Sequence, residues 1–425
     1  MSDHDLIVHG SNVSLAITDG MITAVGTSIS GSASEEIDFG DNVILPGWID
    51  AHVHFNEPGR VDWEGFATGS RALAAGGGTA YFDMPLNSSP PVITRAAFEE
   101  KRRIGEEKSC LDFALWAGLT PDSLDHMEVM ADAGAIGFKA FMCPSGIDEF
   151  QSSNPSTLRK GMEIAAWLNL PVAVHAEDPE VIRRHQLAHP PGLSDMRAWL
   201  DSRPIEAELS AIRIATDLAG ETGCDLHIVH VTCPEGIDLV SSAKSRGVRV
   251  TVETCPHYLL LDDRMAITIG PAAKCAPPLR PAETVAAMWK KLLAGEIDTI
   301  GSDHSPSPPE LKQGDNIFAM WGGIAGIQHG LPLMLGRSLD FIPQISSNVS
   351  KRFRLANKGS LNTGHDADFI VLEKKPFTIT RDSLLTRHPI SPYIGLTSPY
   401  TIAATYLRGQ KVTSETRGKF LSPRS

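Results

Sequence analysis

The sequence predicts an α/β protein in which a (β/α)8 barrel carries a small β-sandwich formed by the N- and C-terminal segments. Eight short apolar runs, each followed by a segment of helical period, fill the middle of the chain, and both ends are strand-like. The 425 residues exceed what one hydrophobic core usually organises. We expect the barrel to span 48–355 and the sandwich to combine 1–47 with 356–425.

The two ends of the chain share one pattern, in which short apolar runs alternate with turns. These runs lie at 5–10, 13–17, 21–26, 368–372 and 402–407. Asp19-Gly20 separates two of the runs and is typical of a β-hairpin. Because a different kind of sequence lies between the two ends, they are predicted to form one β domain together.

The middle of the chain alternates between strand-like and helix-like segments. The strand-like runs lie at 43–54, 78–85, 111–117, 135–142, 171–176, 225–232, 248–255 and 297–303. Helix start signals occur between them, such as Thr120-Pro121 and the segment that begins at Pro204. Their number and total length are those of a TIM-like barrel. A doubly wound open sheet is the rival, but no G-x-G-x-x-G motif follows any of these runs.

Three connections are longer than most loops of a compact domain: 143–157, 189–203 and 305–318. They are rich in Pro, Ser, Gly and Asp, and each follows the carboxyl end of a predicted strand. Barrels place their chemistry at this end, so we expect lids or binding loops there.

Composition excludes several classes of protein. With 42% hydrophobic and 21% charged residues the chain is typical of globular proteins, and its net charge of −13 argues against a nucleic-acid partner. It shows neither a signal-peptide pattern nor 18 consecutive apolar residues, so no membrane association is expected. The six cysteines form no C-x-x-C pair, which favours reduced thiols and a cytoplasmic location.

Polar side chains recur where the predicted strands end. His52 and His54 are two residues apart, so on a strand both project from the same face. The same rim receives Lys139 from the fourth strand, His175 from the fifth, His230 from the sixth and Asp303 from the eighth. Each histidine alone is more often structural than a ligand, but their convergence on one rim predicts a metal site.

Lys139 needs a separate explanation, because an ammonium group cannot ligate a cation. A neutral lysine amine that reacts with CO2 becomes a carbamate (N6-carboxylysine), whose two oxygens can bridge two metals. We therefore expect two divalent ions: one held by His52, His54 and Asp303, the other by His175 and His230, with the Lys139 carbamate between them. Zinc suits these ligands best, and cobalt, manganese or nickel remain possible.

Three further histidines lie near this rim. His227 precedes His230 by three residues and is expected on the opposite strand face, in a packing role. His304 is expected to face away from the site beside Asp303 and to support it indirectly. His257 closes the seventh strand and could orient a ligand or hold a loop.

These residues resemble the ligand pattern of the amidohydrolase superfamily, in particular the cyclic amidohydrolases: dihydroorotases, hydantoinases and allantoinases. The resemblance covers nearly the whole chain and is strongest to the allantoinases. The segments that carry it are 54–60, 63–66, 83–88, 253–258, 274–280, 302–308, 321–324 and 358–368.

Two positions distinguish this sequence from dihydroorotases and hydantoinases. Dihydroorotases generally carry an arginine two residues after the H-x-H pair, where it pairs with the substrate carboxylate; here that residue is Asn56. Hydantoinases usually have a tyrosine five residues after the bridging lysine; here it is Pro144. The resemblance implies substrate contacts by Asn56, Asn87, Ser145 and Ala276, and by the loops 144–150, 274–278 and 322–329.

The resemblance implies metal-dependent hydrolysis of allantoin to allantoate, a step of purine degradation. Asp303 would be the catalytic acid and base, and the enzyme a homotetramer acting on a small molecule. Two alternatives stay open: another cyclic amidohydrolase, of the hydantoinase, dihydropyrimidinase or dihydroorotase type, and a non-catalytic scaffold relative.

Overall fold

Two sheets of parallel strands form the wall of a barrel in the computed structural model, which describes residues 2–188 and 195–423. One sheet has the order β6-β7-β8 and the other the order β14-β13-β12-β11-β10-β9. The strands are β6 (Trp48–Val53), β7 (Gly78–Asp83), β8 (Asp112–Leu115), β9 (Ala117–Gly118), β10 (Phe138–Phe141), β11 (Pro171–His175), β12 (Asp225–Ile228), β13 (Val250–Thr254) and β14 (Thr299–Ile300).

Backbone hydrogen bonds join the two sheets at both edges. The His54 amide donates to the His304 carbonyl at 2.8 Å, which links the chain after β14 to β6. At the other edge the Ile136 amide donates to the Leu115 carbonyl at 3.0 Å. The wall is therefore closed, so the barrel prediction is confirmed and the open doubly wound sheet is excluded.

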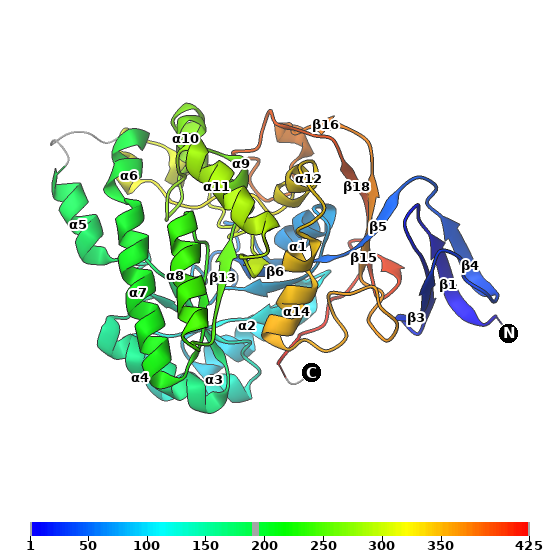
Figure 1. The fold of residues 1–425 in the computed structure, drawn as a ribbon, viewed down its shortest axis with the longest axis horizontal. Helices are drawn as coiled ribbons and strands as arrows, with labels where there is room; N and C mark the ends of the chain where they lie inside the picture. The colour runs from blue at the N-terminus through cyan, green and yellow to red at the C-terminus, as the bar shows by residue number, and fades with distance from the viewer. Residues whose placement is uncertain (1, 189–194, 424–425) are drawn as a thin grey trace.

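Helices cover the outside of the barrel, with α4, α7 and α8 side by side in Figure 1. The α-helices are α1 (Phe66–Ala75), α2 (Arg95–Lys108), α3 (Met127–Asp132), α4 (Pro155–Leu168), α5 (Pro179–Ala188), α6 (Met196–Ser202), α7 (Ile205–Thr222), α8 (Pro234–Ser245), α9 (Pro256–Leu260), α10 (Asp263–Ile269), α11 (Ala282–Leu293), α12 (Gly330–Leu335), α13 (Ile342–Ile345) and α14 (Ser347–Phe353). Short 3-10 helices are η1 (Pro121–His126), η2 (Gly270–Ala273), η3 (Pro309–Lys312), η4 (Ile317–Ala319) and η5 (Arg381–Ser383).

Local signals in the sequence explain where these helices begin. The predicted start at Thr120-Pro121 is confirmed: Thr120 is the N-cap residue of η1, its backbone amide donates to Oγ of Ser123 at 2.8 Å, and η1 leads directly into α3. Pro204 is the N-cap residue of α7, as its position before a helical run predicts.

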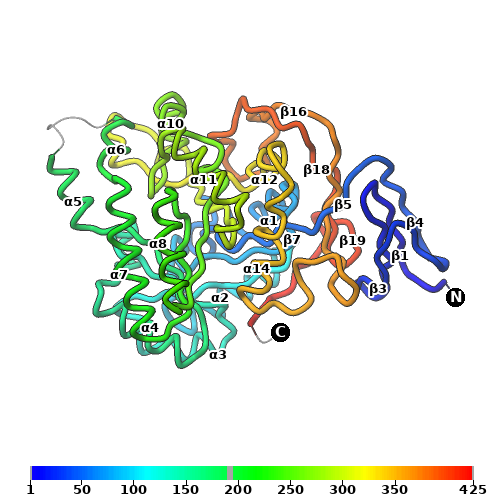
Figure 2. Tube along the Cα trace, in the orientation of Figure 1, coloured from blue at the N-terminus to red at the C-terminus, as the bar shows by residue number. Residues whose placement is uncertain are grey.

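A small β-sandwich lies at one end of the molecule, as Figures 1 and 2 show, and combines both ends of the chain. Its first sheet, in the order β3-β2-β1-β4, contains β1 (His4–His9), β2 (Ser14–Thr18), β3 (Met21–Gly26) and β4 (Ala33–Asp38). Its second sheet, in the order β19-β18-β15-β5, contains β5 (Val43–Pro46), β15 (Phe369–Glu373), β18 (Thr401–Leu407) and β19 (Gln410–Lys411). A separate pair consists of β16 (Phe377–Thr378) and β17 (Thr397–Ser398).

The two sheets of the sandwich share one buried core. Val8 and Leu15 from the first sheet belong to the same hydrophobic cluster as Phe369 and Val371 from the second. The predicted hairpin between β2 and β3 is confirmed, because Asp19 and Gly20 both adopt the left-handed conformation of a tight hairpin turn. The fold class predicted from the sequence is thus confirmed, while the exact domain boundaries stay a prediction.

Three local predictions need correction. The run 43–54 forms two strands, because the strand is interrupted at Gly47. A Cβ atom at this position would lie 2.2 Å from the side chain of Thr79. Strand β4 was not predicted, because its sequence is charged and exposed. Helix α6 lies in a stretch predicted as loop: the Asp195 side chain caps it, and Trp199 and Leu200 pack on its buried face. The rest of that stretch, 189–194, lies outside the described residues.

A fully buried ion pair ties the outer layer to the barrel rim. The Lys101 ammonium on α2 lies 2.7 Å from Oδ2 of Asp83 and donates to the Met84 carbonyl, also at 2.7 Å. Oδ1 of Asp83 accepts a hydrogen bond from the Phe55 amide at 2.8 Å. The pair thereby holds the segment that directly follows His54.

Replacing Lys101 by methionine leaves the Asp83 carboxylate buried without its cation, and should lower the free energy of unfolding by about 3–5 kcal/mol. Denaturant titration followed by circular dichroism measures this change. Arg103→Ala is the matched control, because it removes an exposed pair on the same helix and should cost less than about 0.5 kcal/mol. Equal unfolding midpoints for the two variants would contradict the role of the buried pair.

Candidate functional site

A cavity of about 740 Å³ opens at the carboxyl ends of the barrel strands. All six residues predicted as metal ligands line it: His52, His54, Lys139, His175, His230 and Asp303. Three of the predicted substrate contacts, Asn87, Ser145 and Ala276, also line it. The structure therefore brings residues from five strands of the barrel to one place.

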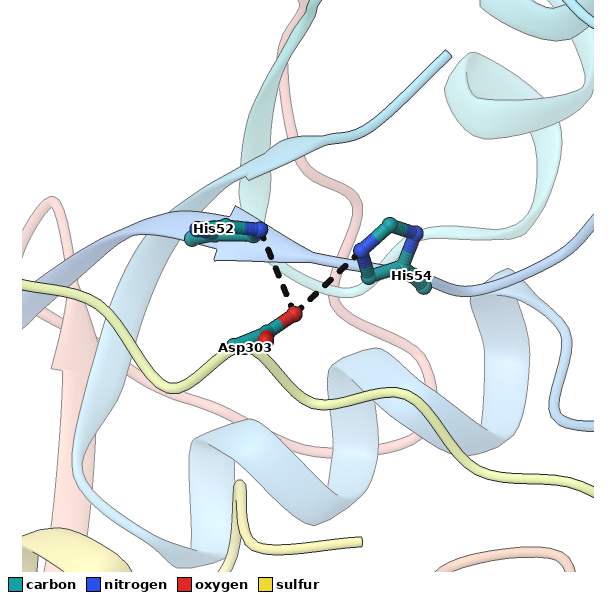
Figure 3. Close-up of side chains that lie close together, drawn as sticks. All are labelled: His52, His54 and Asp303. Carbon is teal, nitrogen blue, oxygen red and sulfur yellow. Dashed lines mark ion pairs between the residues drawn. The ribbon is translucent and has the colours of Figure 1, made fainter. Parts of the chain in front are cut away.

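His52, His54 and Asp303 form one half of this cluster, shown in Figure 3. Oδ1 of Asp303 lies 3.2 Å from Nε2 of His52 and 3.3 Å from Nε2 of His54. Asp303 has a φ of 45°, an uncommon conformation for a residue other than glycine. The three ligand-type atoms lie within 4.8 Å of one another, so this group can hold a divalent metal ion.

His175, His230 and Lys139 form the other half of the cluster. The ring centroids of His175 and His230 are 4.6 Å apart, and those of His230 and His52 are 5.6 Å apart. Lys139 is fully buried, and its Nζ has no hydrogen-bond partner among the described residues. A buried polar atom without a partner is costly, so this amine fits a site completed by a further group.

Burial controls protonation in the cluster. It lowers the pKa of His52 and of His230 well below the ordinary value, and nearby positive groups act in the same direction. Burial also lowers the pKa of Lys139 to about 8, against the opposing charges of Asp303 and Glu253. For His175, burial is outweighed by contacts with Cys143 and Glu177, which raise the pKa to about 9. Neutral imidazole is the form that binds a metal, so His52 and His230 are suited to that role.

Two buried glutamates that the sequence reasoning missed orient two of these imidazoles. Oε1 of Glu253 lies 2.8 Å from Nδ1 of His52, and Oε2 of Glu177 lies 2.7 Å from Nε2 of His175. When a ring nitrogen donates its proton to a carboxylate, the other ring nitrogen keeps a free lone pair. For His52 that second nitrogen is the one that faces Asp303. The sequence contained a signal for both glutamates, because each lies at or just beyond the end of a buried strand.

The expectation that His227 faces away from the site is wrong. Nε2 of His227 lies 3.5 Å from Oε2 of Glu253, and the same carboxylate group contacts His52. His227 and His52 therefore both face the barrel interior. Strand alternation fails because His230 lies beyond the end of β12 and has a φ of 44°. Nδ1 of His227 contacts Oγ1 of Thr251 at 2.8 Å, which agrees with a packing role.

His304 and His257 are both buried beside the cluster. Nε2 of His304 lies 3.4 Å from Oε2 of Glu64, so its ring faces Glu64 and not the group formed by His52, His54 and Asp303. Neither ring nitrogen of His257 has a hydrogen-bond partner among the described residues, and burial lowers its pKa to about 4. The supporting roles predicted for both residues stay predictions.

Asn56 does not lie where the sequence analysis expected it. Its side chain is fully buried and is not part of the cavity lining. A left-handed backbone conformation, with a φ of 65°, accompanies a side-chain amide that donates to the Pro306 carbonyl at 3.4 Å. Direct contact between Asn56 and a substrate in the cavity is therefore not supported.

One wall of the cavity comes from the described part of the stretch 189–203, expected to be a lid or binding loop, from loop 274–278, and from Trp321, which the sequence did not assign to the site. Helix α6 provides Trp199, and Arg203 directly follows it. Lys274 and Trp321 come from the loops after η2 and η4. Loop 274–278 was expected to contact a ring, but no feature of the sequence indicated that Trp199 packs beside it.

The sequence profile described as "Amidohydrolase family" matches residues 43–412, which is most of the chain. The chain belongs to this family. A curated allantoinase of Rubrobacter xylanophilus is 46% identical over 100% of this chain and 98% of its own length. A curated allantoinase of Deinococcus radiodurans is also 46% identical, over 97% of this chain and 95% of its own length.

Solved structures of related enzymes have the same fold as this amidohydrolase. The L-hydantoinase (dihydropyrimidinase) of Arthrobacter aurescens superposes with a TM-score of 0.94 at 31% identity, covering 99% of this chain and 100% of its own. The dihydropyrimidinase of Brevibacillus agri superposes with a TM-score of 0.86 at 26% identity, covering 99% and 98%.

The contact between Glu253 and His52 leads to a test of metal affinity. Glu253→Ala removes the acceptor that orients the imidazole and should weaken metal binding by about 10- to 100-fold. Glu253→Gln is the matched control, because its amide oxygen can still accept from Nδ1, and it should retain most of the affinity. The zinc affinity of each variant is obtained from its metal content at equilibrium in zinc-buffered solutions. Equal metal content in wild type and Glu253→Ala would contradict the positioning role.

Proposed function

We propose that this protein hydrolyses the cyclic amide of allantoin and releases allantoate, a step of purine degradation. The observation that carries the proposal is the convergence of six ligand-type residues on one cavity, in a chain that is 46% identical to curated allantoinases over nearly its full length. A cavity of about 740 Å³ is of a size that accepts a small cyclic ureide.

We propose two divalent metal ions as cofactors, held by the six ligand-type residues, with zinc favoured over cobalt, manganese or nickel. The buried amine of Lys139, which has no hydrogen-bond partner among the described residues, supports its carboxylation by CO2, because a carbamate is an anionic group that could help to hold the metal ions. When bound, such ions polarise a carbonyl group and lower the pKa of water.

The proposed catalytic residue is Asp303, which would move a proton between the attacking water and the leaving ring nitrogen. Burial acts to raise the pKa of its carboxyl group, but the hydrogen bond and charge of His54 outweigh this and hold the pKa below the ordinary value. The carboxylate is therefore ionised near neutral pH, as a general base must be. Its backbone conformation directs it into the cavity, beside the two histidines of the H-x-H pair.

A hydantoinase or dihydropyrimidinase activity is the second candidate, favoured by the close superposition with the L-hydantoinase of Arthrobacter aurescens. Dihydroorotate is less favoured, because Asn56 stands in place of the arginine that would pair with its carboxylate. A non-catalytic scaffold is disfavoured, because all six ligand-type residues are present around the cavity.

The homotetramer and the cytoplasmic location stay predictions. Within residues 2–188 and 195–423, no helix combines the length and the hydropathy needed to span a bilayer.

Allantoin hydrolysis with and without a chelator tests the proposed function. The zinc-loaded protein should convert allantoin to allantoate faster than hydantoin or dihydrouracil, because a substrate-specific cavity favours one ring substituent. Prolonged dialysis against a chelator should reduce the rate to that of the uncatalysed reaction, and added zinc should restore it. A rate that survives complete metal removal would exclude the metal-dependent mechanism, and a preference for hydantoin would support the second candidate.

Asp303→Asn tests the catalytic residue. The amide keeps the size of the side chain but cannot take up a proton, so kcat should fall by about 10²- to 10⁴-fold. Asp217→Asn on α7, where the carboxylate is exposed, is the control and should leave kcat unchanged. Circular dichroism verifies that both variants fold. An Asp303→Asn enzyme with most of its turnover would refute the proton-transfer role.

A further inference from the structure

One wall of the cavity contains a lysine without a carboxylate partner. Lys274 lines the cavity, and its Nζ lies 4.1 Å from the centroid of the Trp199 ring. The one hydrogen bond that this Nζ donates to the described residues goes to the backbone carbonyl of Met320. Among the described residues, no carboxylate forms an ion pair with it. A lysine amine has two N–H donors and its protonated form three, so at least one donor of Lys274 remains available to a molecule in the cavity.

The surroundings of Lys274 make this position electrostatically unfavourable. Only 2% of the residue is exposed. Burial, together with the positive charges of Lys312 and Arg203, lowers the pKa of Lys274 to about 7. An apolar residue of the same size would avoid the cost of desolvation, so a buried lysine needs either a full set of protein acceptors or another role. Its location on a cavity wall instead indicates recognition of an electron-rich group.

Lys312, the neighbouring buried lysine, shows what a purely structural role looks like. Its Nζ donates to the carbonyls of Pro271, Trp321 and Gly323, at 3.1, 3.3 and 2.7 Å, so all of its donors have partners within the protein. It is not part of the cavity lining. Lys274 lines the cavity and has fewer acceptors within the described protein. Lys312 therefore stabilises the loops, whereas Lys274 is placed to contact a ligand.

We propose that Lys274 determines substrate specificity by donating a hydrogen bond to the ureido carbonyl of the substrate, the group that distinguishes allantoin from hydantoin. This inference rests on the proposed function. The scissile ring amide must lie beside Asp303 and the histidines, so the ring substituent extends toward the other walls of the cavity. A ureido group presents a carbonyl acceptor without a net charge. The wall formed by Trp199, Lys274 and Arg203 offers N–H donors to such a group, from cations that lie over the Trp199 ring.

The test is the ratio of kcat/KM for allantoin to kcat/KM for hydantoin, measured on the zinc-loaded enzyme. If hydantoin is not hydrolysed, its affinity is measured instead, as the constant for competitive inhibition of allantoin hydrolysis. Lys274→Met removes the donor but keeps much of the side-chain volume, and the preference for allantoin should fall by about 10- to 100-fold. Lys312→Met is the matched control: it should alter rates for both substrates together and leave the ratio unchanged.

A second measurement does not depend on the folding of any variant. Wild-type enzyme should process a hydantoin carrying an alkyl group of matched size about 10- to 100-fold less efficiently than allantoin, because the alkyl group cannot accept a hydrogen bond.

An unchanged ratio in folded Lys274→Met, or equal use of the alkyl compound by wild type, overturns the role of Lys274. A larger loss for dihydroorotate than for allantoin overturns it too, because it would show that this lysine recognises a carboxylate. Absence of allantoin turnover in wild type contradicts the proposed function instead, so the two failures are distinguishable.

Discussion

Closure of the barrel is the constraint on which the rest of the structure depends. The hydrogen bond from the His54 amide to the His304 carbonyl joins the first strand to the chain that follows the last one. Because His52 lies two residues before His54 and Asp303 directly precedes His304, closing the wall also brings an imidazole pair and a carboxylate into contact. The buried Asp83–Lys101 pair supports the same segment from outside. Fold and site are therefore stabilised by the same contacts.

Most side chains of the site are polar and buried, and the way in which each is satisfied indicates its role. His52 and His175 each have a glutamate that fixes one ring nitrogen, so the other nitrogen is available. Within the part of the chain that the structure describes, Nζ of Lys139 has no hydrogen-bond partner and Nζ of Lys274 has a single carbonyl acceptor. Groups whose hydrogen bonds are complete have a structural role, whereas incomplete hydrogen bonding supports the roles proposed for Lys139 and Lys274.

The comparisons show that the fold is shared more widely than the sequence. The fold superposes with an L-hydantoinase at a TM-score of 0.94, yet the sequence identity is only 31%, below the 46% shared with curated allantoinases. In a barrel of this kind the residues suited to bind metal lie at the strand ends, whereas the loops form the walls of the cavity. Changes in the loops can therefore alter substrate specificity without disturbing the catalytic residues. Trp199 and Lys274 lie on such walls, which is why we place substrate selection there.

The sequence by itself determined the fold class and the six ligand-type positions, because buried strands and the residues at their ends follow a local period that is readable along the chain. It also determined the hairpin at Asp19-Gly20, since turn chemistry is local. Only the tertiary structure decided which partners these residues meet. Glu253 reaches His52 across 201 positions of sequence, and Trp199 meets Lys274 by packing of a helix predicted as loop. His227 and Asn56 were misplaced for the same reason: their orientation depends on positive-φ residues and long-range contacts that no local pattern encodes.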